Sequence, residues 1–249
     1  MKGLLATVRF LTILPVPGGY GAEQTDLARG VPYFPVVGML LGALAALLAW
    51  AASLVAPPMV VSAAIVVLLL GFSGGLHLDG LCDTADGLLS ARPRERALEI
   101  MKDSHVGSMG VMAVVCVLLM KFASLASLPP ECLWPAAFLM PLAGRCAMVM
   151  HMALLPYVRS SGLGSVFYTN RRYLAAIESV VLLLAACWLM FDSGGWIVAG
   201  VSIAVVVCLA VYFRCRIGGA TGDTFGAACE IVEIMPALTM ALWTFPFAK

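Results

Sequence analysis

The sequence predicts an all-α membrane protein with about seven transmembrane helices, and two observations support this fold class. Of the 249 residues, 62% are hydrophobic and only 12% are charged, whereas a soluble domain carries about a quarter charged residues. The hydrophobic residues also gather into runs, and a membrane-spanning helix needs roughly 17–25 predominantly apolar residues. We therefore expect one integral membrane domain over residues 1–249.

The apolar runs give the predicted order of the helices. Seven runs are candidate spans: 32–55, 59–74, 109–128, 133–153, 174–191, 196–213 and 231–247. The second and the fifth are short, so we expect a tilted or partial helix there. The segment 1–30 is predicted to be retained and to lie at the membrane surface, because Arg9 splits its apolar part and no small-residue cleavage site follows.

The connections between these runs fall into two groups. Those near residues 57, 130 and 193 are short and carry few charges. The others are long and basic: the N-terminus, 75–108, 154–173 and 214–230. This second group holds twelve of the fifteen Lys and Arg residues, and an excess of basic residues marks the cytoplasmic face. We therefore expect a cytoplasmic N-terminus and cytoplasmic active-site loops.

Charge and cysteine content exclude some functions. The formal net charge of +1 leaves no basic face for a nucleic acid. The eight cysteines include no C-x-x-C pair, which argues against a disulfide framework and against a zinc site.

The stretch GGLHLDGLCDTADGLLSAR, residues 74–92, contains Asp79, Asp83 and Asp86. Their spacing of four and then three residues places them in one stripe of a helix. Like charges on one face repel, so a divalent cation is expected to offset them, and carboxylate oxygens suit Mg²⁺. The alternative is a set of solvated acids at a helix N-terminus. Three acids close to His77 at the lipid boundary favour the metal.

A second cluster is MKDSHVGSMG, residues 101–110. Lys102 and Asp103 precede Ser104, which we expect to cap the next helix and to leave its first amides open to an anion. The alternative is a simple cap beside charged interfacial residues.

A third cluster is GGATGDTFGAACE, residues 218–230, before the last span. Asp223 and Glu230 are seven residues apart, again on one helix face, and Gly222 is among the glycines that keep the backbone accessible. This pair is predicted to supply a second metal ligand or the general base.

Two charged residues fall inside the predicted spans, where charge usually marks function. Arg145 lies in the cytoplasmic half of its span and is expected to reach a phosphate. Lys121 lies toward the outer half and is expected only to snorkel. The loop RSSGLGSVFYTNRR, residues 159–172, begins with Arg159. It is either a lid over an anionic substrate or a basic loop that follows the orientation rule.

With these clusters the chain resembles the adenosylcobinamide-GDP ribazoletransferase (cobalamin-5′-phosphate synthase) family. GGLHLDGLCDTADGL and MKDSHVGSMGV resemble its two signature stretches. FLTILPVP near the start, GR at 144–145, GLG at 162–164 and TGDTFGA at 221–227 are similar too, so the resemblance covers almost the whole chain. His105 departs from the pattern, since the family is expected to have Arg there.

The resemblance implies an Mg²⁺-dependent phosphotransferase of the bacterial inner membrane. Such an enzyme joins adenosylcobinamide-GDP to α-ribazole or α-ribazole 5′-phosphate and releases GMP, which attaches the lower ligand of cobalamin. A ribose hydroxyl attacks a diphosphate, a step that depends on positioning and charge neutralisation. The general base stays open between Asp223, His77 and one of the three aspartates.

The spacing and the resemblance together give the candidate residues. They are Asp83, Asp86, Asp223 and His77 for catalysis; Lys102, Asp103, Ser104, Arg145, Gly222 and Arg159 for substrate binding; and Asp79, Asp83, Asp86 and Glu230 for the metal.

Two other functions compete with this one. DTADGLLSAR, residues 83–92, is similar to the opening of the CDP-alcohol phosphotransferase motif, but the later acidic half is missing. A secondary transporter is the other, although its site would lie near the midplane, often between inverted repeats. The expected partners are small-molecule substrates and membrane lipid, and a homo-oligomer is compatible with the sequence.

Overall fold

The computed structural model describes residues 2–16, 24–159 and 162–245. Within these ranges the chain forms helices joined by loops, and the single isolated bridge between Tyr157 and Ala220 belongs to no strand. The elements are α1 (Lys2–Leu11), α2 (Gln24–Ala28), η1 (Val31–Tyr33), α3 (Phe34–Ala52), α4 (Pro58–Ser73), α5 (Leu76–Leu88), α6 (Arg94–Ile100), α7 (Ser108–Ala126), α8 (Pro130–Leu154), η2 (Leu163–Phe167), α9 (Arg171–Ile217), α10 (Gly222–Val232) and α11 (Met235–Thr244). The predicted all-α class is confirmed.

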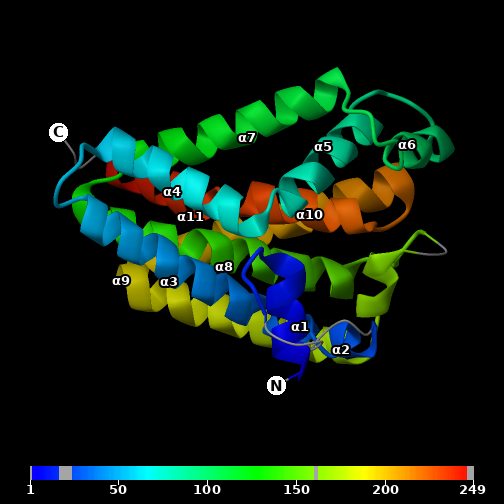
Figure 1. Ribbon diagram of the computed structural model, residues 1–249, viewed down its shortest axis with the longest axis horizontal. Helices are drawn as coiled ribbons and strands as arrows, with labels where there is room; N and C mark the ends of the chain where they lie inside the picture. Colours follow the sequence, from blue (N-terminus) through cyan, green and yellow to red (C-terminus); the bar gives the residue numbers. More distant parts are fainter. Residues whose placement is uncertain (1, 17–23, 160–161, 246–249) are drawn as a thin grey trace.

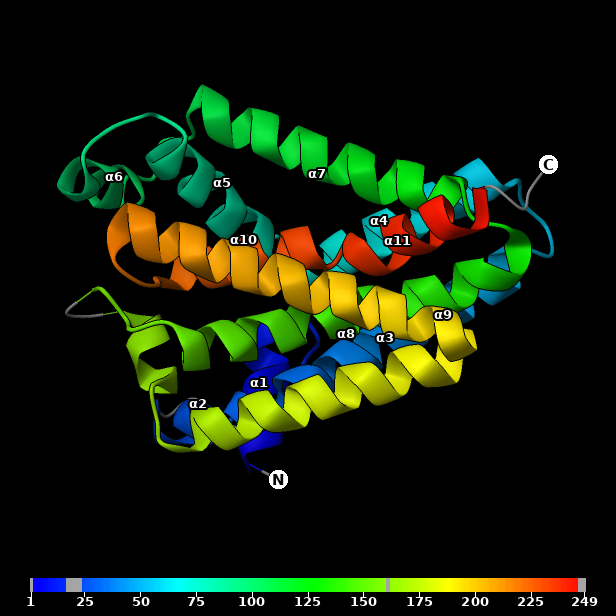
Figure 2. The same cartoon turned by 180° about the vertical axis from the view of Figure 1, so that it is seen from behind.

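Helix α8 forms the centre of the bundle, with α3 and α9 packed along it (Figures 1 and 2). It is buried over most of its length, including both Pro135 and Pro141. Small residues on α3 allow a close approach: a Cβ at Gly38 would lie 2.8 Å from the carbonyl oxygen of Pro141. Such contacts are typical of helix pairs in membranes, where close packing replaces the hydrophobic effect as the source of association.

Five helices of the described chain are long and apolar enough to cross a membrane, or six if the bent pair α4–α5 forms one span. The predicted count of seven is not confirmed. The predicted spans 174–191 and 196–213 both lie in α9, which consists of two helices joined at a kink where Phe191 and Asp192 leave helical geometry. The last span starts earlier than predicted, because the candidate span runs over Gly222–Thr244. Most of the predicted loop 214–230 is therefore helical.

The acidic helix α5 turns away from α4 by 89°. The turn lies at Gly74 and Gly75, whose φ angles of 58° and 74° are in the left-handed region. Glycine adopts this conformation without the strain that a Cβ would add. The short second span is thus a partial helix, as predicted. Helix α5, which follows the turn, carries the three aspartates and runs across the bundle.

The two predicted groups of connections lie at opposite ends of the bundle. Helices α5 and α6, the start of α10 and the loop after α8 gather at one end, and the turns joining α3 to α4 and α7 to α8 lie at the other (Figures 1 and 2). Residues 1 and 17–23 of the predicted N-terminal segment, and Lys249, lie outside the described residues.

Candidate active site

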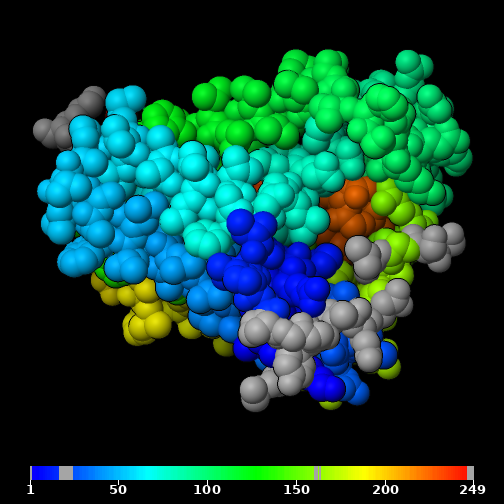
Figure 3. Space-filling view, in the orientation of Figure 1, coloured from blue at the N-terminus to red at the C-terminus, as the bar shows by residue number. Residues whose placement is uncertain are grey.

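A cavity of about 210 Å³ opens at the end of the bundle that holds the long connections. Its walls come from α1, α5, α8, α10 and the loop after α8, whose segments meet on one face of the molecule (Figure 3). The lining includes the predicted residues His77, Asp79, Arg159, Gly222 and Asp223. The structure therefore joins residues from the first acidic stretch, the basic loop and the third cluster in one site.

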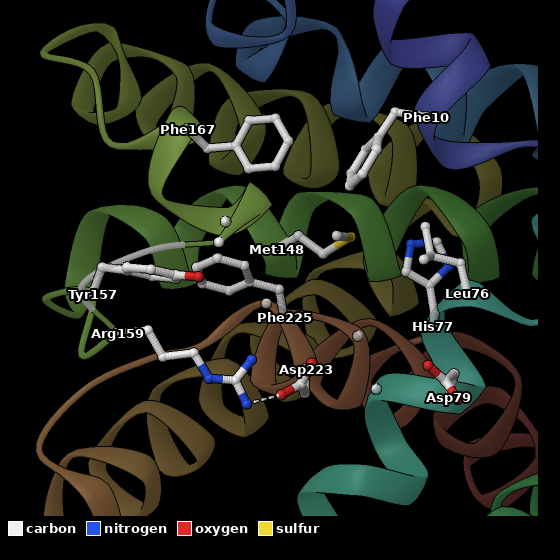
Figure 4. Close-up of a pocket in the computed structure, with 15 residues that line it drawn as sticks. Phe10, Leu76, His77, Asp79, Met148, Tyr157, Arg159, Phe167, Asp223 and Phe225 are labelled. Carbon is white, nitrogen blue, oxygen red and sulfur yellow. Dashed lines mark hydrogen bonds and ion pairs between the residues drawn. The ribbon is translucent and has the colours of Figure 1, made fainter. Parts of the chain in front are cut away.

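A glycine contact between α5 and α10 brings the two acidic segments together. A Cβ at Gly80 would lie 2.8 Å from the carbonyl oxygen of Asp223, and one at Gly226 would lie 2.9 Å from that of His77. The backbones of the two helices are therefore in contact at Gly80 and Gly226, and a larger side chain at either position would push them apart. Asp79 and Asp223 flank this crossing and both line the cavity (Figure 4).

Asp83 lies one helical turn beyond Asp79, on α5 and outside the five long membrane helices. Burial, and next the negative charges of Asp79 and Asp223, raise the pKa of Asp83 to about 6. Burial and this cluster of carboxylates therefore make ionisation of Asp83 less favourable than usual when no cation is bound.

Arg159 closes one side of the cavity. Its Nη2 donates to Oδ2 of Asp223 at 2.6 Å and to the carbonyl oxygen of Met101 at 3.2 Å (Figure 4). The loop is held there by the bridge, in which Val158 N donates to Ala220 O at 3.0 Å. Thr221 caps α10 through its side chain, so Gly222 and Asp223 begin that helix facing the arginine.

Asp86 has a different environment from the other two aspartates. Its Oδ2 accepts from Gly107 N at 2.7 Å and its Oδ1 accepts from Gly110 N at 2.8 Å. Asp86 thus caps α7 from another helix, where the helix dipole favours a negative charge. The expectation that Ser104 caps this helix and leaves its amides open is wrong, because the N-cap is Gly107 and Asp86 occupies two of the amides.

Lys102, Asp103 and Ser104 lie in an exposed loop and do not line the cavity. Asp103 accepts from His105 N at 3.1 Å, and its Oδ1 lies 2.6 Å from His105 Nδ1. These hydrogen bonds lower the pKa of Asp103 and raise that of His105. The predicted contact of Lys102, Asp103 and Ser104 with substrate stays a prediction.

A cluster of four charged side chains, which we call the buried charge cluster, lies between α7, α8 and the α10–α11 segment. It consists of Lys121, Arg145, Glu230 and Glu233, each no more than 4% exposed. Lys121 Nζ donates to Glu230 at 2.6 Å and to Glu233 at 2.9 Å, and Arg145 donates to Glu233. The expectation that Lys121 snorkels is wrong. Arg145 and Glu230 serve as partners in this cluster and neither lines the cavity.

His77 connects the buried charge cluster to the cavity. Arg145 Nη2 lies 3.5 Å from His77 Nδ1, and because a guanidinium can only donate, Nδ1 is the acceptor. The ring proton of the neutral imidazole is then on Nε2. That atom is buried and has no hydrogen-bond partner among the described residues, so it is available to donate to a ligand in the cavity.

Glu233 and the apolar lining of the cavity were not among the residues predicted from the sequence. Glu233 carried a usable signal, since it is an acidic residue within the predicted span 231–247. The apolar lining carried none: Phe10, Met148 and Phe167 come from segments far apart in a chain where apolar residues are the rule.

Comparison with known proteins identifies the family. The family model described as cobalamin-5-phosphate synthase matches residues 3–241. Three curated relatives are each named adenosylcobinamide-GDP ribazoletransferase. Those from Acetivibrio thermocellus and Desulforamulus reducens are 34% and 38% identical, with 93% of this chain and 94% and 93% of the relative covered. That from Pseudomonas putida is 39% identical over 97% of this chain and 99% of its own.

No solved structure matches this chain. The relatives favour neither the lipid enzyme nor the transporter considered above. Since the family model spans nearly the whole chain and the relatives exceed 30% identity over more than nine-tenths of it, the chain belongs to the cobalamin-5-phosphate synthase family.

Proposed function

We propose that this protein joins adenosylcobinamide-GDP to α-ribazole or its 5′-phosphate and releases GMP, the activity that gives its relatives their name. The observation that carries the proposal is the crossing of α5 and α10. At this crossing Asp79 and Asp223 line one cavity, and Arg159 donates a hydrogen bond to Asp223. A carboxylate pair and an arginine at one cavity suit the binding and cleavage of a diphosphate.

Mg²⁺ fits the carboxylates on α5. Among the described residues, no three His, Cys, Asp or Glu side chains are arranged to hold a metal by themselves. However, magnesium is usually held by one or two carboxylates together with substrate phosphates. The pKa of Asp83 is raised first by burial and then by the negative charges of Asp79 and Asp223, charges that a cation would offset. Asp79 and Asp83 would hold the ion. Asp86 and Glu230 are left out, because each already has its own partners.

When bound, the ion would neutralise charge on the diphosphate and on the departing GMP. Arg159 would exchange its bond to Asp223 for the diphosphate, since a phosphate offers a guanidinium several anionic oxygen acceptors. Asp223 would then accept the proton of the ribose hydroxyl as its oxygen bonds to the cobinamide-side phosphorus. The bond from that phosphorus to the GMP oxygen breaks, and GMP leaves with the electron pair.

We also propose that this end of the bundle faces the cytoplasm of a bacterial inner membrane. The basis is the charge distribution, since twelve of fifteen Lys and Arg residues lie on the N-terminal segment and the long connections, and α5, α6 and the loop after α8 lie at this end. Nucleotide substrates would reach the cavity from that side.

The direct test is GMP release by detergent-purified protein supplied with adenosylcobinamide-GDP, α-ribazole 5′-phosphate and Mg²⁺. We expect GMP and a corrinoid of the coupled mass, both dependent on Mg²⁺. Asp83→Asn should lower the rate by about 10²–10³-fold, the usual effect of removing one transition-state electrostatic contact. Absence of GMP from folded wild-type protein with both substrates would refute the proposal.

The pKa of Asp83 predicts how Mg²⁺ stabilises the protein at different pH values. The folded-state pKa of about 6 lies above the ordinary 3.8, so without metal the folded protein loses stability as the pH rises from about 4 through about 6. Bound Mg²⁺ competes with that proton. The rise in melting temperature caused by Mg²⁺ should therefore be larger at pH 8 than at pH 5.

Asp83→Asn is the matched variant for this measurement. It should melt at a higher temperature than wild type at pH 8 without metal, because one repulsive charge is gone, and it should lose most of the Mg²⁺ effect. An Mg²⁺ effect equal at both pH values would contradict the role given to Asp83.

A further inference from the structure

The site cavity has two chemically different ends. Arg159, Asp223 and Asp79 lie along one side, and Phe10 and Phe167 face each other across the opposite side, with Met148 between the two groups (Figure 4). The reaction described above uses only the charged end. The apolar end needs its own explanation.

The aromatic rings at the apolar end are held in place by packing. The centroids of Phe10 and Phe167 are 5.3 Å apart, and Phe34 packs edge-on against Phe167 at 5.3 Å. Phe167 is 2% exposed and Phe34 is fully buried. Phe10 is only partly buried, so its ring is the aromatic surface that the cavity presents. Because Phe167 and Phe34 pack behind it, this surface does not need to reorganise when a ligand binds.

The size of the cavity limits what this aromatic surface can bind. Its volume of about 210 Å³ is below the roughly 300–1,000 Å³ of pockets that hold drug-sized ligands. A corrin macrocycle does not fit in that space, whereas one fused bicyclic base does. A planar base also gains from stacking on aromatic side chains.

His77 supplies a polar contact between the two ends. It lines the cavity, it is 1% exposed, and its Nε2 has no hydrogen-bond partner in the described part of the chain. A buried donor without a partner is costly unless a ligand satisfies it. A sugar oxygen of a nucleoside whose base lies against Phe10 is a suitable acceptor.

We propose that the site cavity is the binding site of the nucleoside acceptor, with the planar base against Phe10, whose ring Phe167 holds in place, and the ribose toward His77, Asp79 and Asp223. The benzimidazole base of α-ribazole has this shape and carries little polar surface. The cobinamide nucleotide then meets the charged end from outside the cavity. This inference rests on the proposed function and assigns each of its two substrates to a different part of the site.

The test is equilibrium dialysis of the full-length protein with radiolabelled α-ribazole 5′-phosphate, together with the KM of each substrate in GMP release. Phe167→Leu and Phe10→Leu should each raise the Kd and the KM for α-ribazole 5′-phosphate by about 5- to 150-fold, the equivalent of the ~1–3 kcal/mol that stacking contributes per base. The KM for adenosylcobinamide-GDP should not change. Phe10 lies on the cavity wall from α1, so its variant tests the site if Phe167→Leu folds poorly.

Phe213→Leu is the matched control, because Phe213 is 1% exposed but packs against His151 and does not line the cavity. It should bind α-ribazole 5′-phosphate as wild type does. If the folded Phe167→Leu and Phe10→Leu variants keep the wild-type Kd while GMP release continues, the subsite is wrong and the proposed function stands. A higher KM for adenosylcobinamide-GDP alone would also overturn the subsite. Dialysis reports on the subsite even if no GMP forms.

Discussion

Replacing Glu233 with Gln should destabilise the protein by about 3–5 kcal/mol, the usual cost of removing one partner from a buried ion pair. Glu233 is 2% exposed and accepts from both Lys121 and Arg145. In the variant, two buried cations share the single carboxylate of Glu230. The melting temperature in detergent should fall sharply, and the expressed protein should be prone to aggregation.

The reason lies in the balance of charge in the buried charge cluster. Two cations and two carboxylates sum to zero in wild type, and each carboxylate takes at least one charge-assisted hydrogen bond. A neutral amide at position 233 keeps the volume but leaves one positive charge without compensation. Desolvation of that charge is then no longer offset by its partner.

Two further variants separate charge balance from packing. Lys121→Met combined with Glu233→Gln restores a formal charge of zero, so it should be less destabilised than the sum of the single changes, with a coupling of at least ~1 kcal/mol. Glu131→Gln at the exposed start of α8 should shift stability by no more than ~0.5 kcal/mol. Additive single effects would show that charge balance does not govern this cluster.

The parts of the structure that follow from local pattern were predictable. The length and composition of the apolar runs predicted helices, and the four-and-three spacing of the aspartates predicted one acidic helix. Asp223 was predicted near the same site because it falls on the same side of the membrane. Each of these inferences uses only residues within one element, or the distribution of charge between elements.

The parts that depend on contacts between distant elements were not predictable. Asp86 shares its helical stripe with Asp79 and Asp83, yet it caps α7 because Gly107 and Gly110 lie against it, more than twenty residues further along the chain. The sequence shows that the three aspartates share one face of a helix, but it does not show that the N-terminus of α7 packs on that face. The early start of the last span also depends on a distant contact. The glycines of 218–226 are typical of a loop in the sequence, but in the structure they allow α10 to pack closely against α5.

The contact of α10 with α5 also predicts a large effect on catalysis. Gly226→Ala should lower kcat/KM for GMP release by about 100-fold, because a displacement of about 1 Å between reacting groups has an effect of this size. The new Cβ would lie 2.9 Å from His77 O, 3.2 Å from His77 Cα and 3.3 Å from Gly80 Cα. All three are backbone atoms of α5, so no side chain can rotate away and the two helices must separate.

Separation moves Asp223 away from Asp79 and Asp83, which is why activity should suffer more than stability. Overpacking of this kind costs about 1–3 kcal/mol, so the variant should still fold and melt cooperatively. Gly71→Ala is the matched control, because Gly71 is also helical and a Cβ there meets nothing within 4 Å; its kcat/KM should equal that of wild type. If Gly226→Ala folds and retains full activity, the carboxylates on α5 and α10 do not act as one site, because their separation then has no effect on the reaction.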